Sequence, residues 1–354
     1  VPTLSGVGIV SNNPTDTLSI VNDVVTVTFT SSEAIATKVV TFLSGGDPIT
    51  NAGAITYNNT SGNTWTAAYT AHTNDTDGVV TYSIVVGDLA GNPGTAVTTG
   101  SGSVTFDNTA PTLTSASITS DNSPATHANP GDVVTVTLAA SVAISQPVVT
   151  FKSGGNAVSD GSITYAGSGA NWTAAYTAGA SDTEGAVSFT IAYSDLAGNA
   201  GTNVTSVTNA SSVTFDKTAP TLTSASIASD YSTNTLASTN DEITVTLTAS
   251  EVIAQPTVTF LSGGNPITNA GAITYNNTSG NTWTAAYTAH TNDTDGAVSF
   301  TISYSDLAGN AGTNVTSVTN ASSVTFDKTV PTLSGVGIVS NNPTDTLSIV
   351  NDVV

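Results

Sequence analysis

Short stretches in which apolar and polar residues alternate recur along this chain. Residues 25–30, 134–138 and 243–247 place Val, Ile, Leu or Phe at every second position, with Thr between them. Side chains of a β-strand point alternately to opposite faces, so this period of two predicts strands with one buried and one solvent-facing side. The β-branched Thr of the outer face itself favours strands. Alternation therefore predicts ordered β structure in a chain whose high Thr, Ser and Asn content alone would resemble disorder.

Seven strand candidates recur in each unit of the sequence, separated by clusters of Gly, Asn, Asp and Pro. This number and spacing are typical of a β-sandwich, and no window has the period of a helix. We therefore expect an all-β fold with about seven strands in each domain. In the second unit the candidates are residues 113–118, 133–140, 148–152, 162–165, 172–177, 186–193 and 211–215.

A long internal repeat organises the chain. The same linker proline recurs at Pro2, Pro111, Pro220 and Pro331, at intervals of 109, 109 and 111 residues. Units of this length can bury a core of their own, so we expect separately folded domains and not a solenoid. The last twenty-five residues repeat the first twenty-five letter for letter, so we expect the chain to be a window on a longer periodic array. The predicted domains are residues 1–109, 110–218 and 219–329, and residues 330–354 would start a fourth.

One tryptophan recurs in each unit, at Trp65, Trp172 and Trp283, and Thr-Ala-Ala-Tyr follows it each time. Alternation places Trp172 on the same face of its strand as Ala174 and Tyr176, which predicts an anchor in the core. The alternative is a ligand-stacking residue. A single aromatic residue per unit makes a poor carbohydrate platform, so the core position is favoured.

Three recurring motifs carry a resemblance to a known family. They are a linker of the form Phe-Asp-x-Thr-x-Pro, the turn Asp-Leu-Ala-Gly-Asn and the strand Trp-Thr-Ala-Ala-Tyr. Together they resemble the tandem bacterial immunoglobulin-like (Big-type) repeat domains of large extracellular adhesins and surface fibre proteins, which implies a tandem array of immunoglobulin-like β-sandwich domains. Unlike antibody domains, the chain has no Cys pair, and its Trp lies on the fifth strand. The linkers are residues 106–111, 215–220 and 326–331, and the turns are residues 88–92, 195–199 and 306–310.

Composition excludes several classes of partner. The chain has no Cys, Met or Arg, and its four Lys residues face 25 acidic ones, for a formal net charge of −21. Nucleic-acid binding requires clustered basic residues, and so does docking on an anionic membrane, so neither partner is expected. No apolar run is long enough to span a bilayer. A polar surface with few charges fits an extracellular or cell-surface protein.

The sequence offers little for catalysis. His72 and His290 lie in equivalent loops, where the second unit has Gly179, and His127 lies in a different loop. No Ser-His-Asp spacing repeats, and no glycine-rich phosphate loop follows a strand. Paired carboxylates lie in turns without a nearby base or cation. We therefore expect no enzyme.

Acidic residues predict calcium sites where one domain follows another. In a sandwich of this strand order, the loops after the second, fourth and sixth strands share the pole at which the chain enters. Calcium takes oxygen ligands from such loops. We expect an ion there to neutralise clustered carboxylates and lock one domain against the next. The carboxylates predicted to gather are Glu33 and Asp88 in the first unit, linker Asp107 with Asp195 in the second, and linker Asp216 with Glu251 and Asp306 in the third; linker Asp327 would serve the next unit.

The second unit departs from this pattern. Val142 stands where the other units have Glu33 and Glu251, which predicts a weaker or missing ion between the first two units. For the Asp of Asp-Leu-Ala-Gly-Asn, a simpler role is open and compatible with an ion: its side chain can cap its own turn through backbone N–H groups.

A second calcium hypothesis concerns the opposite pole, where the chain leaves each unit. A short acidic turn recurs there, although it lacks the spacing of an EF-hand, and such sequences also form ordinary turns. Its carboxylates are Asp75 and Asp77, Asp182 and Glu184, and Asp293 and Asp295.

Patchwise copying of the units favours a structural role. Spacers need only correct folds and junctions, whereas binding sites need particular loops. We therefore predict an extracellular rod or filament component whose partners are neighbouring repeats of its own chain. Two alternatives stay open: an adhesin stalk or binding region that contacts glycans or other cells, through loops such as 58–63 and 276–281, and self-association into fibres through an exposed strand such as 330–354.

Overall fold

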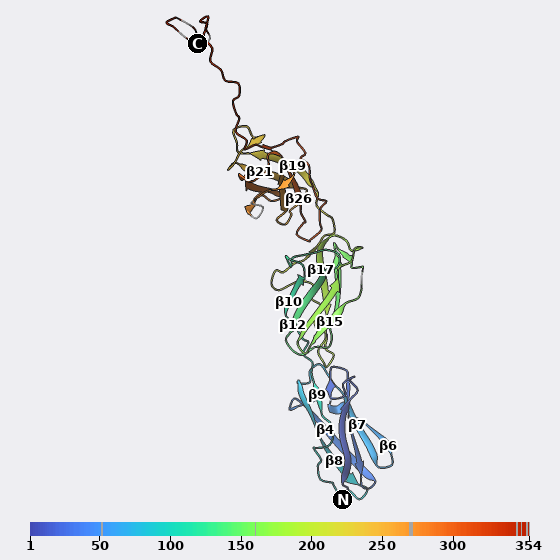
Figure 1. Ribbon diagram of the computed structural model, residues 1–354. Helices are drawn as coiled ribbons and strands as arrows, with labels where there is room; N and C mark the ends of the chain where they lie inside the picture. The colour runs from blue at the N-terminus through green and yellow to red at the C-terminus, as the bar shows by residue number, and fades with distance from the viewer. Residues whose placement is uncertain are drawn as a thin grey trace. The chain divides into compact units, whose positions relative to one another are not determined.

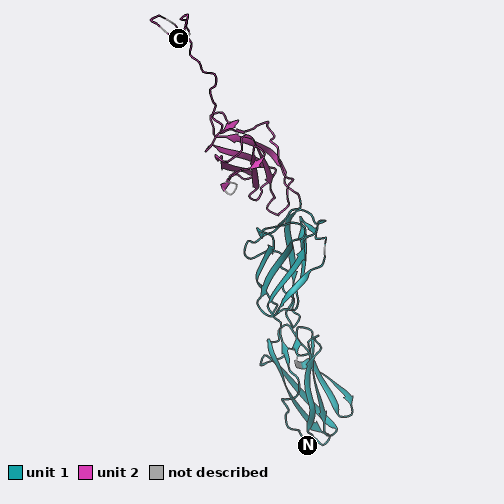
Figure 2. Ribbon diagram, in the orientation of Figure 1, with its two compact units in different colours: residues 1–217 teal, residues 218–354 magenta. Residues whose placement is uncertain are grey.

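The structure is a computed structural model that describes residues 1–50, 52–159, 161–268, 272–344, 346–347, 349–351 and 353. Two compact units compose it, residues 1–217 and residues 218–354 (Figure 2). The first unit contains two β-sandwiches, here called repeat 1 and repeat 2 after the predicted domains, and the second contains repeat 3 and the segment that follows it. No helix in the described part of the chain is long and apolar enough to cross a membrane.

Within the described residues, each repeat has nine strands. Figure 1 labels several of them. Those of repeat 1 are β1 Leu4–Ser11, β2 Leu18–Ser19, β3 Val24–Ser31, β4 Ile35–Ser44, β5 Asp47–Pro48, β6 Thr56–Ser61, β7 Thr64–Thr70, β8 Gly78–Asp88 and β9 Val104–Phe106, with a 3-10 turn at Ala52–Ala54. Those of repeat 2 are β10 Leu113–Ser120, β11 His127–Ala128, β12 Val133–Ala140, β13 Val148–Ser153, β14 Asn156–Ala157, β15 Thr164–Ser168, β16 Asn171–Thr177, β17 Gly185–Ala192 and β18 Thr214–Phe215. Those of repeat 3 are β19 Leu222–Ser229, β20 Leu236–Ala237, β21 Glu242–Ala249, β22 Thr257–Ser262, β23 Asn265–Pro266, β24 Thr274–Ser279, β25 Thr282–Thr288, β26 Gly296–Ser303 and β27 Thr325–Phe326.

The strands of each repeat form two sheets. In repeat 2 a four-stranded antiparallel sheet has the order β10-β12-β16-β15, and a five-stranded sheet has the order β11-β18-β17-β13-β14. Repeats 1 and 3 have the same two orders. The prediction of an all-β, immunoglobulin-like sandwich is therefore confirmed. Two short strands per repeat were not predicted: β11 pairs in parallel with β18, and β14 pairs with β13.

Alternation builds the core as predicted. In β12 the side chains of Val134, Val136 and Leu138 are buried, whereas the Thr side chains between them face outward. Each repeat has its own cluster of buried residues, within residues 9–106, 116–215 and 225–326. Trp172 is half-buried and packs against the core of repeat 2, and the other two tryptophans do the same in theirs, so each tryptophan lies at the edge of the core and not at its centre.

Residues 330–354 form no strand among their described residues. The same letters in residues 1–25 form β1, β2 and the start of β3. Asp345, Ser348, Asp352 and Val354 lie outside the described residues. A partner strand like β3 is needed to pair with such a segment, so the predicted start of a fourth repeat stays a prediction.

Candidate functional site

The two poles of each sandwich hold the acidic residues singled out from the sequence. We call the end at which the chain enters a repeat its N-terminal pole, and the end at which it leaves its C-terminal pole. At the N-terminal pole of repeat 1, Ile35, the first residue of β4, pairs with Asp88, the last residue of β8. In repeats 2 and 3 the equivalent loop residues form isolated bridges, Ile144 with Asp195 and Ile253 with Asp306. The predicted gathering of these loops at one pole is therefore confirmed.

The Asp of each Asp-Leu-Ala-Gly-Asn turn caps that turn. Asp88 Oδ1 accepts hydrogen bonds from the N–H groups of Ala90 (2.9 Å) and Asn92 (2.8 Å), and the Asn92 side chain donates to Oδ2 (2.9 Å). These bonds from Asn92 hold the pKa of Asp88 below its ordinary value of 3.8. Asp195 and Asp306 make the corresponding bonds with Asn199 and Asn310. All three Asp residues are buried, so the capping role is confirmed.

Two of the predicted carboxylate pairs come together. In repeat 1, the amino group of Val1 lies 3.5 Å from Glu33 Oε1 and 3.9 Å from Asp88 Oδ2. In repeat 3, carboxylate oxygens of Glu251 and Asp306 lie within 4.8 Å of each other. Repeat 2 places Val142, which is exposed, at the corresponding position. The carboxylates of Glu251 and Asp306 are therefore close enough to share one cation.

Inside the first unit, the junction of repeats 1 and 2 is a set of polar contacts. The Asn199 side chain donates to the carbonyl of linker residue Asp107 (3.0 Å) and to Asp195 Oδ2 (3.0 Å). From repeat 1, the buried Asn13 side chain donates to the carbonyl of Ala197 (2.9 Å). Amide side chains therefore join the linker and both repeats here. The sequence did not single them out, although Asn199 is the last residue of a recurring motif.

The linker Asp residues play a local part. The backbone N–H of Asp107 donates to the carbonyl of Ser19 (2.9 Å), which continues the pairing of β9 with β2. Its Oδ1 accepts the N–H of Thr109 (2.9 Å), which closes a tight turn. Asp216 and Asp327 donate to Ala128 and Ala237 in the same way. Each linker therefore starts as an extension of a short strand.

At the C-terminal pole, the first acidic residue of each turn holds backbone. Asp75 Oδ1 accepts the N–H of Thr50 (2.7 Å), and Oδ2 accepts the N–H of His72 (2.8 Å). Asp182 and Asp293 are buried and accept two backbone N–H groups in the same way. These carboxylates tie neighbouring loops together, and calcium binding by them stays a prediction.

The second acidic residue of each turn holds the linker. Asp77 Oδ1 accepts the N–H of Asn108 (2.7 Å), Glu184 Oε1 accepts that of Lys217 (3.0 Å), and Asp295 Oδ1 accepts that of Lys328 (3.0 Å). The sequence prediction placed these acids at the pole but missed the linker residue. The sequence did contain a signal, because that residue is the first variable position of the Phe-Asp-x-Thr-x-Pro motif, directly after Asp.

Hydrogen bonds and nearby charge at this pole lower the pKa values of two carboxyl groups. Burial raises the pKa of Asp182, but backbone hydrogen bonds and the nearby Lys217 ammonium outweigh it, and the pKa falls below 3.8. The hydroxyl of Thr329, the N–H of Lys328 and the charge of Lys328 together lower the pKa of Asp295. Both groups are therefore anionic at neutral pH and suited to hold a linker or a cation.

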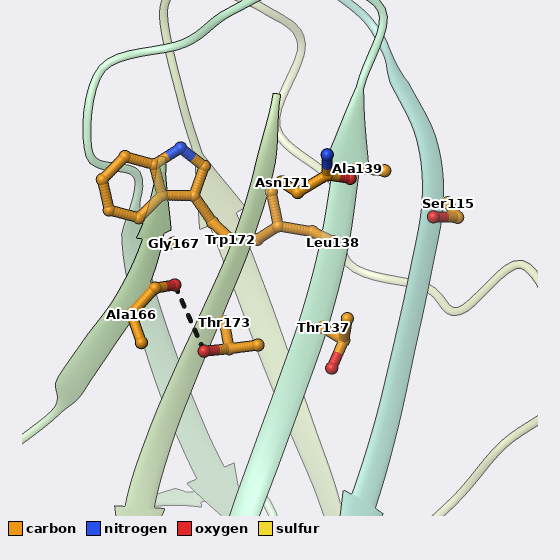
Figure 3. Close-up of a pocket in the computed structure, with 9 residues that line it drawn as sticks. All are labelled: Ser115, Thr137, Leu138, Ala139, Ala166, Gly167, Asn171, Trp172 and Thr173. Atoms are coloured by element: carbon orange, nitrogen blue, oxygen red, sulfur yellow. Dashed lines mark hydrogen bonds between the residues drawn. The ribbon is translucent and has the colours of Figure 1, made fainter. Parts of the chain in front are cut away.

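Repeat 2 also has a hollow of about 400 Å³ over its four-stranded sheet, lined by Trp172 and by small side chains (Figure 3). In repeats 1 and 3, paired Thr hydroxyls lie at the corresponding place: Thr30 with Thr64, and Thr248 with Thr282. Repeat 2 pairs Ala139 with Asn171 instead. The lining residues are Ser115, Thr137, Leu138, Ala139, Ala166, Gly167, Asn171, Trp172 and Thr173.

No family model matches the chain, and no curated protein matches it. Among solved structures, it is similar to a three-domain I-band fragment of titin, with 12% identity over 92% of this chain and 98% of that one and a TM-score of 0.36. It is also similar to the N-terminal eight Ig domains of DSCAM, with 13% identity over 91% of this chain and 42% of that one and a TM-score of 0.27. A complex of Dpr2 with DIP-Theta matches with 12% identity over 92% and 99% and a TM-score of 0.27.

Proposed function

We propose that the chain is a structural spacer: part of an extracellular rod or filament, of the kind found in bacterial surface fibre proteins, in which each immunoglobulin-like repeat adds length. The recurrence of one linker attachment supports this. At the end of each of the three repeats, a carboxylate of the C-terminal pole accepts the same linker N–H. An attachment that recurs at the end of every repeat fits a role set by spacing.

Small-angle scattering on the full chain and on a variant lacking residues 110–218 tests this proposal. A spacer loses maximum dimension in proportion to the deleted repeat. An individual sandwich with strands of about ten residues at roughly 3.3 Å each is about 35 Å long. An unchanged maximum dimension would contradict the proposal, and particles of several chains would support assembly into fibres instead.

Calcium at the N-terminal poles is the second part of the proposal. The donor set fits, because Glu and Asp carboxylates are the oxygen ligands that calcium takes. Glu251 and Asp306 of repeat 3 lie close together. These residues would hold the ion, which would neutralise their mutual repulsion.

Thermal unfolding with added calcium and with chelator tests that part. We expect calcium to raise the melting temperature of repeat 3, and Glu251→Gln to remove most of the rise. Val142→Glu in repeat 2 is the matched gain-of-site variant and should create a new response. Equal melting temperatures in calcium and chelator would overturn the calcium proposal without touching the spacer proposal.

An adhesin stalk or binding region is the second candidate function. The observation that favours it is the hollow of repeat 2, which presents the indole of Trp172 beside hydroxyl and amide groups (Figure 3). A glycan array decides between the two. Specific binding that Asn171→Thr abolishes would support a binding region, whereas no binding would leave the spacer.

A further inference from the structure

One position in each linker contacts the C-terminal pole of its own repeat through both backbone and side chain. It is the residue that follows the linker Asp: Asn108, Lys217 or Lys328. We call this residue, together with the acid that accepts its N–H, the clasp of that repeat. The three clasps are Asn108 with Asp77, Lys217 with Glu184, and Lys328 with Asp295.

The backbone half of the clasp is shared. The acid accepts the linker N–H in all three repeats. In repeats 1 and 3 its other oxygen accepts the hydroxyl of the next linker residue: Thr109 to Asp77 Oδ2 (2.6 Å), and Thr329 to Asp295 Oδ2 (2.6 Å). Hydrogen bonds to a charged group are stronger than neutral ones. One carboxylate therefore fixes two consecutive residues of the linker.

The side-chain half differs between repeats. In repeat 1, the Asn108 amide donates to the carbonyl of Thr73 (3.0 Å). In repeat 2, the Lys217 ammonium donates to the carbonyls of Ala180 (3.0 Å) and Asp182 (2.7 Å). In repeat 3, the Lys328 ammonium likewise reaches two carbonyls of the same turn, those of Thr291 and Asp293. A neutral amide in repeat 1 thus replaces a cation that bridges two loop carbonyls.

The surroundings follow the same division. Asp47 of repeat 1 accepts the hydroxyl of Thr76 (3.0 Å). Asn156 and Asn265 occupy its place in the other repeats, and their amides contact the corresponding Thr hydroxyls. At these two positions repeat 1 therefore has a carboxylate and a neutral amide, where the other repeats have a neutral amide and an ammonium. This difference makes the potential around the repeat 1 clasp more negative, which disfavours an anionic acceptor there.

We propose that this linker position sets how firmly each linker is held to the repeat before it. Lys217 and Lys328 carry a built-in cation that closes the pole without a metal ion, whereas Asn108 leaves the pole of repeat 1 the loosest of the three. These are positioning residues, and their consequence for reach or stiffness rests on the proposed spacer function. The two Lys clasps hold their linkers whether or not calcium is bound at the opposite pole.

Amide hydrogen exchange on the full chain in chelator tests the proposal. We expect the amide of Asn108 to exchange at least about fivefold faster than those of Lys217 and Lys328, since charged hydrogen bonds contribute about 1 kcal/mol more than neutral ones. Asn108→Lys with Asp47→Asn should slow exchange at position 108 to the rate of the other repeats. Lys217→Asn should quicken it at position 217 by about the same factor.

Two further variants separate the clasp from folding. Asp77→Asn removes the charge at constant shape and should raise the rate of exchange at position 108. Asp77→Glu introduces the residue of repeat 2, keeps the charge and should leave position 108 protected. Strand amides should be unchanged in every variant. Equal exchange at the three positions, no response to the swaps, or loss of protection at Lys217 in chelator would overturn the proposal. The scattering length of the deletion variant does not depend on the clasp, so the spacer proposal can stand or fall separately.

Discussion

Residues 1–25 and 330–354 have the same sequence and different structures. In repeat 1, β1 pairs with β3, and Ile9 is 3% exposed, whereas the equivalent Ile338 is 79% exposed in a segment without a described strand. Proline shows the same contrast, because Pro2 is buried and Pro331 is exposed. The apolar alternation therefore makes this segment able to form a strand, but the strand forms only where a partner strand and an opposite sheet are present.

The local part of the segment is alike in both copies. Asn12 and Asn341 each accept, through their side chains, the N–H of a residue twelve positions on. Asn13 and Asn342 each accept the N–H two residues on, from Thr15 at 3.0 Å and from Thr344 at 3.0 Å. Turn hydrogen bonds are thus present without a sandwich, whereas β1 pairing is not. The comparison separates what short-range sequence determines from what tertiary contacts determine.

Supplying residues 330–354 with a partner strand should have the largest effect on this contrast. If residues 26–109 are appended after Val354, the tail gains the equivalents of β3 and the opposite sheet, and residues 333–340 should become a strand. We expect their amides to reach the protection of residues 4–11 in hydrogen exchange. Persistently unprotected amides in the extended chain would show that the contrast has another origin.

Matched substitutions should reveal the same difference energetically. Ile9→Ala removes a buried side chain and should lower the free energy of unfolding of repeat 1 by about 2–5 kcal/mol. Ile338→Ala changes the same letters in an exposed segment and should leave every unfolding transition unchanged. Denaturant unfolding followed by the recurring tryptophans measures both, and similar losses would contradict the comparison.

A smaller difference is expected at the asparagines. Asn13 also donates to Asp23 Oδ2 (2.8 Å) and to the carbonyl of Ala197 in repeat 2 (2.9 Å), so Asn13→Ala removes both bonds, including the one to the buried Ala197. The expected loss is about 1–3 kcal/mol. Asn342→Ala should leave the melting of the three repeats unchanged. Differential scanning calorimetry of the two variants checks this, and equal melting temperatures would remove Asn13 from the junction.

The smallest expected effect is that of acid, which should lower the stability of the folded repeats and leave residues 330–354 unaffected. The pKa values of Asp88, Asp182 and Asp295 are lower in the folded chain than the ordinary 3.8. A lowered folded pKa contributes stability that is complete above the unfolded pKa and is lost as pH falls through the folded pKa. Melting temperatures should therefore be insensitive to these groups above about pH 5 and decline below about pH 4. A decline that is complete by pH 5 would contradict these assignments.

Alternation and turn spacing predicted the six longer strands of repeat 2 to within a few residues, the buried face of β12 and the packing of Trp172 against the core. The seventh candidate, residues 211–215, contains only the two-residue strand β18. Alternation missed β11 and β14, because a two-residue strand shows no period. The recurring motif predicted that Asp88, Asp195 and Asp306 each lie at the N-terminal pole of their own repeat. It did not reveal that Asp77 and Asp295 would bind linker residues. Such contacts depend on side chains that are far apart in sequence, such as Asn199 and Asp107, which only the folded chain brings together.

Backbone ¹⁵N relaxation of the full chain tests most directly whether the linkers are built parts of the repeats. If each linker is held by its C-terminal pole, the amides of Asn108, Lys217 and Lys328 should have order parameters near the rigid-backbone value of about 0.85. The adjoining strands should show the same value. Order parameters below about 0.6 at these three amides, with rigid strands on either side, would mean free tethers and would contradict the account.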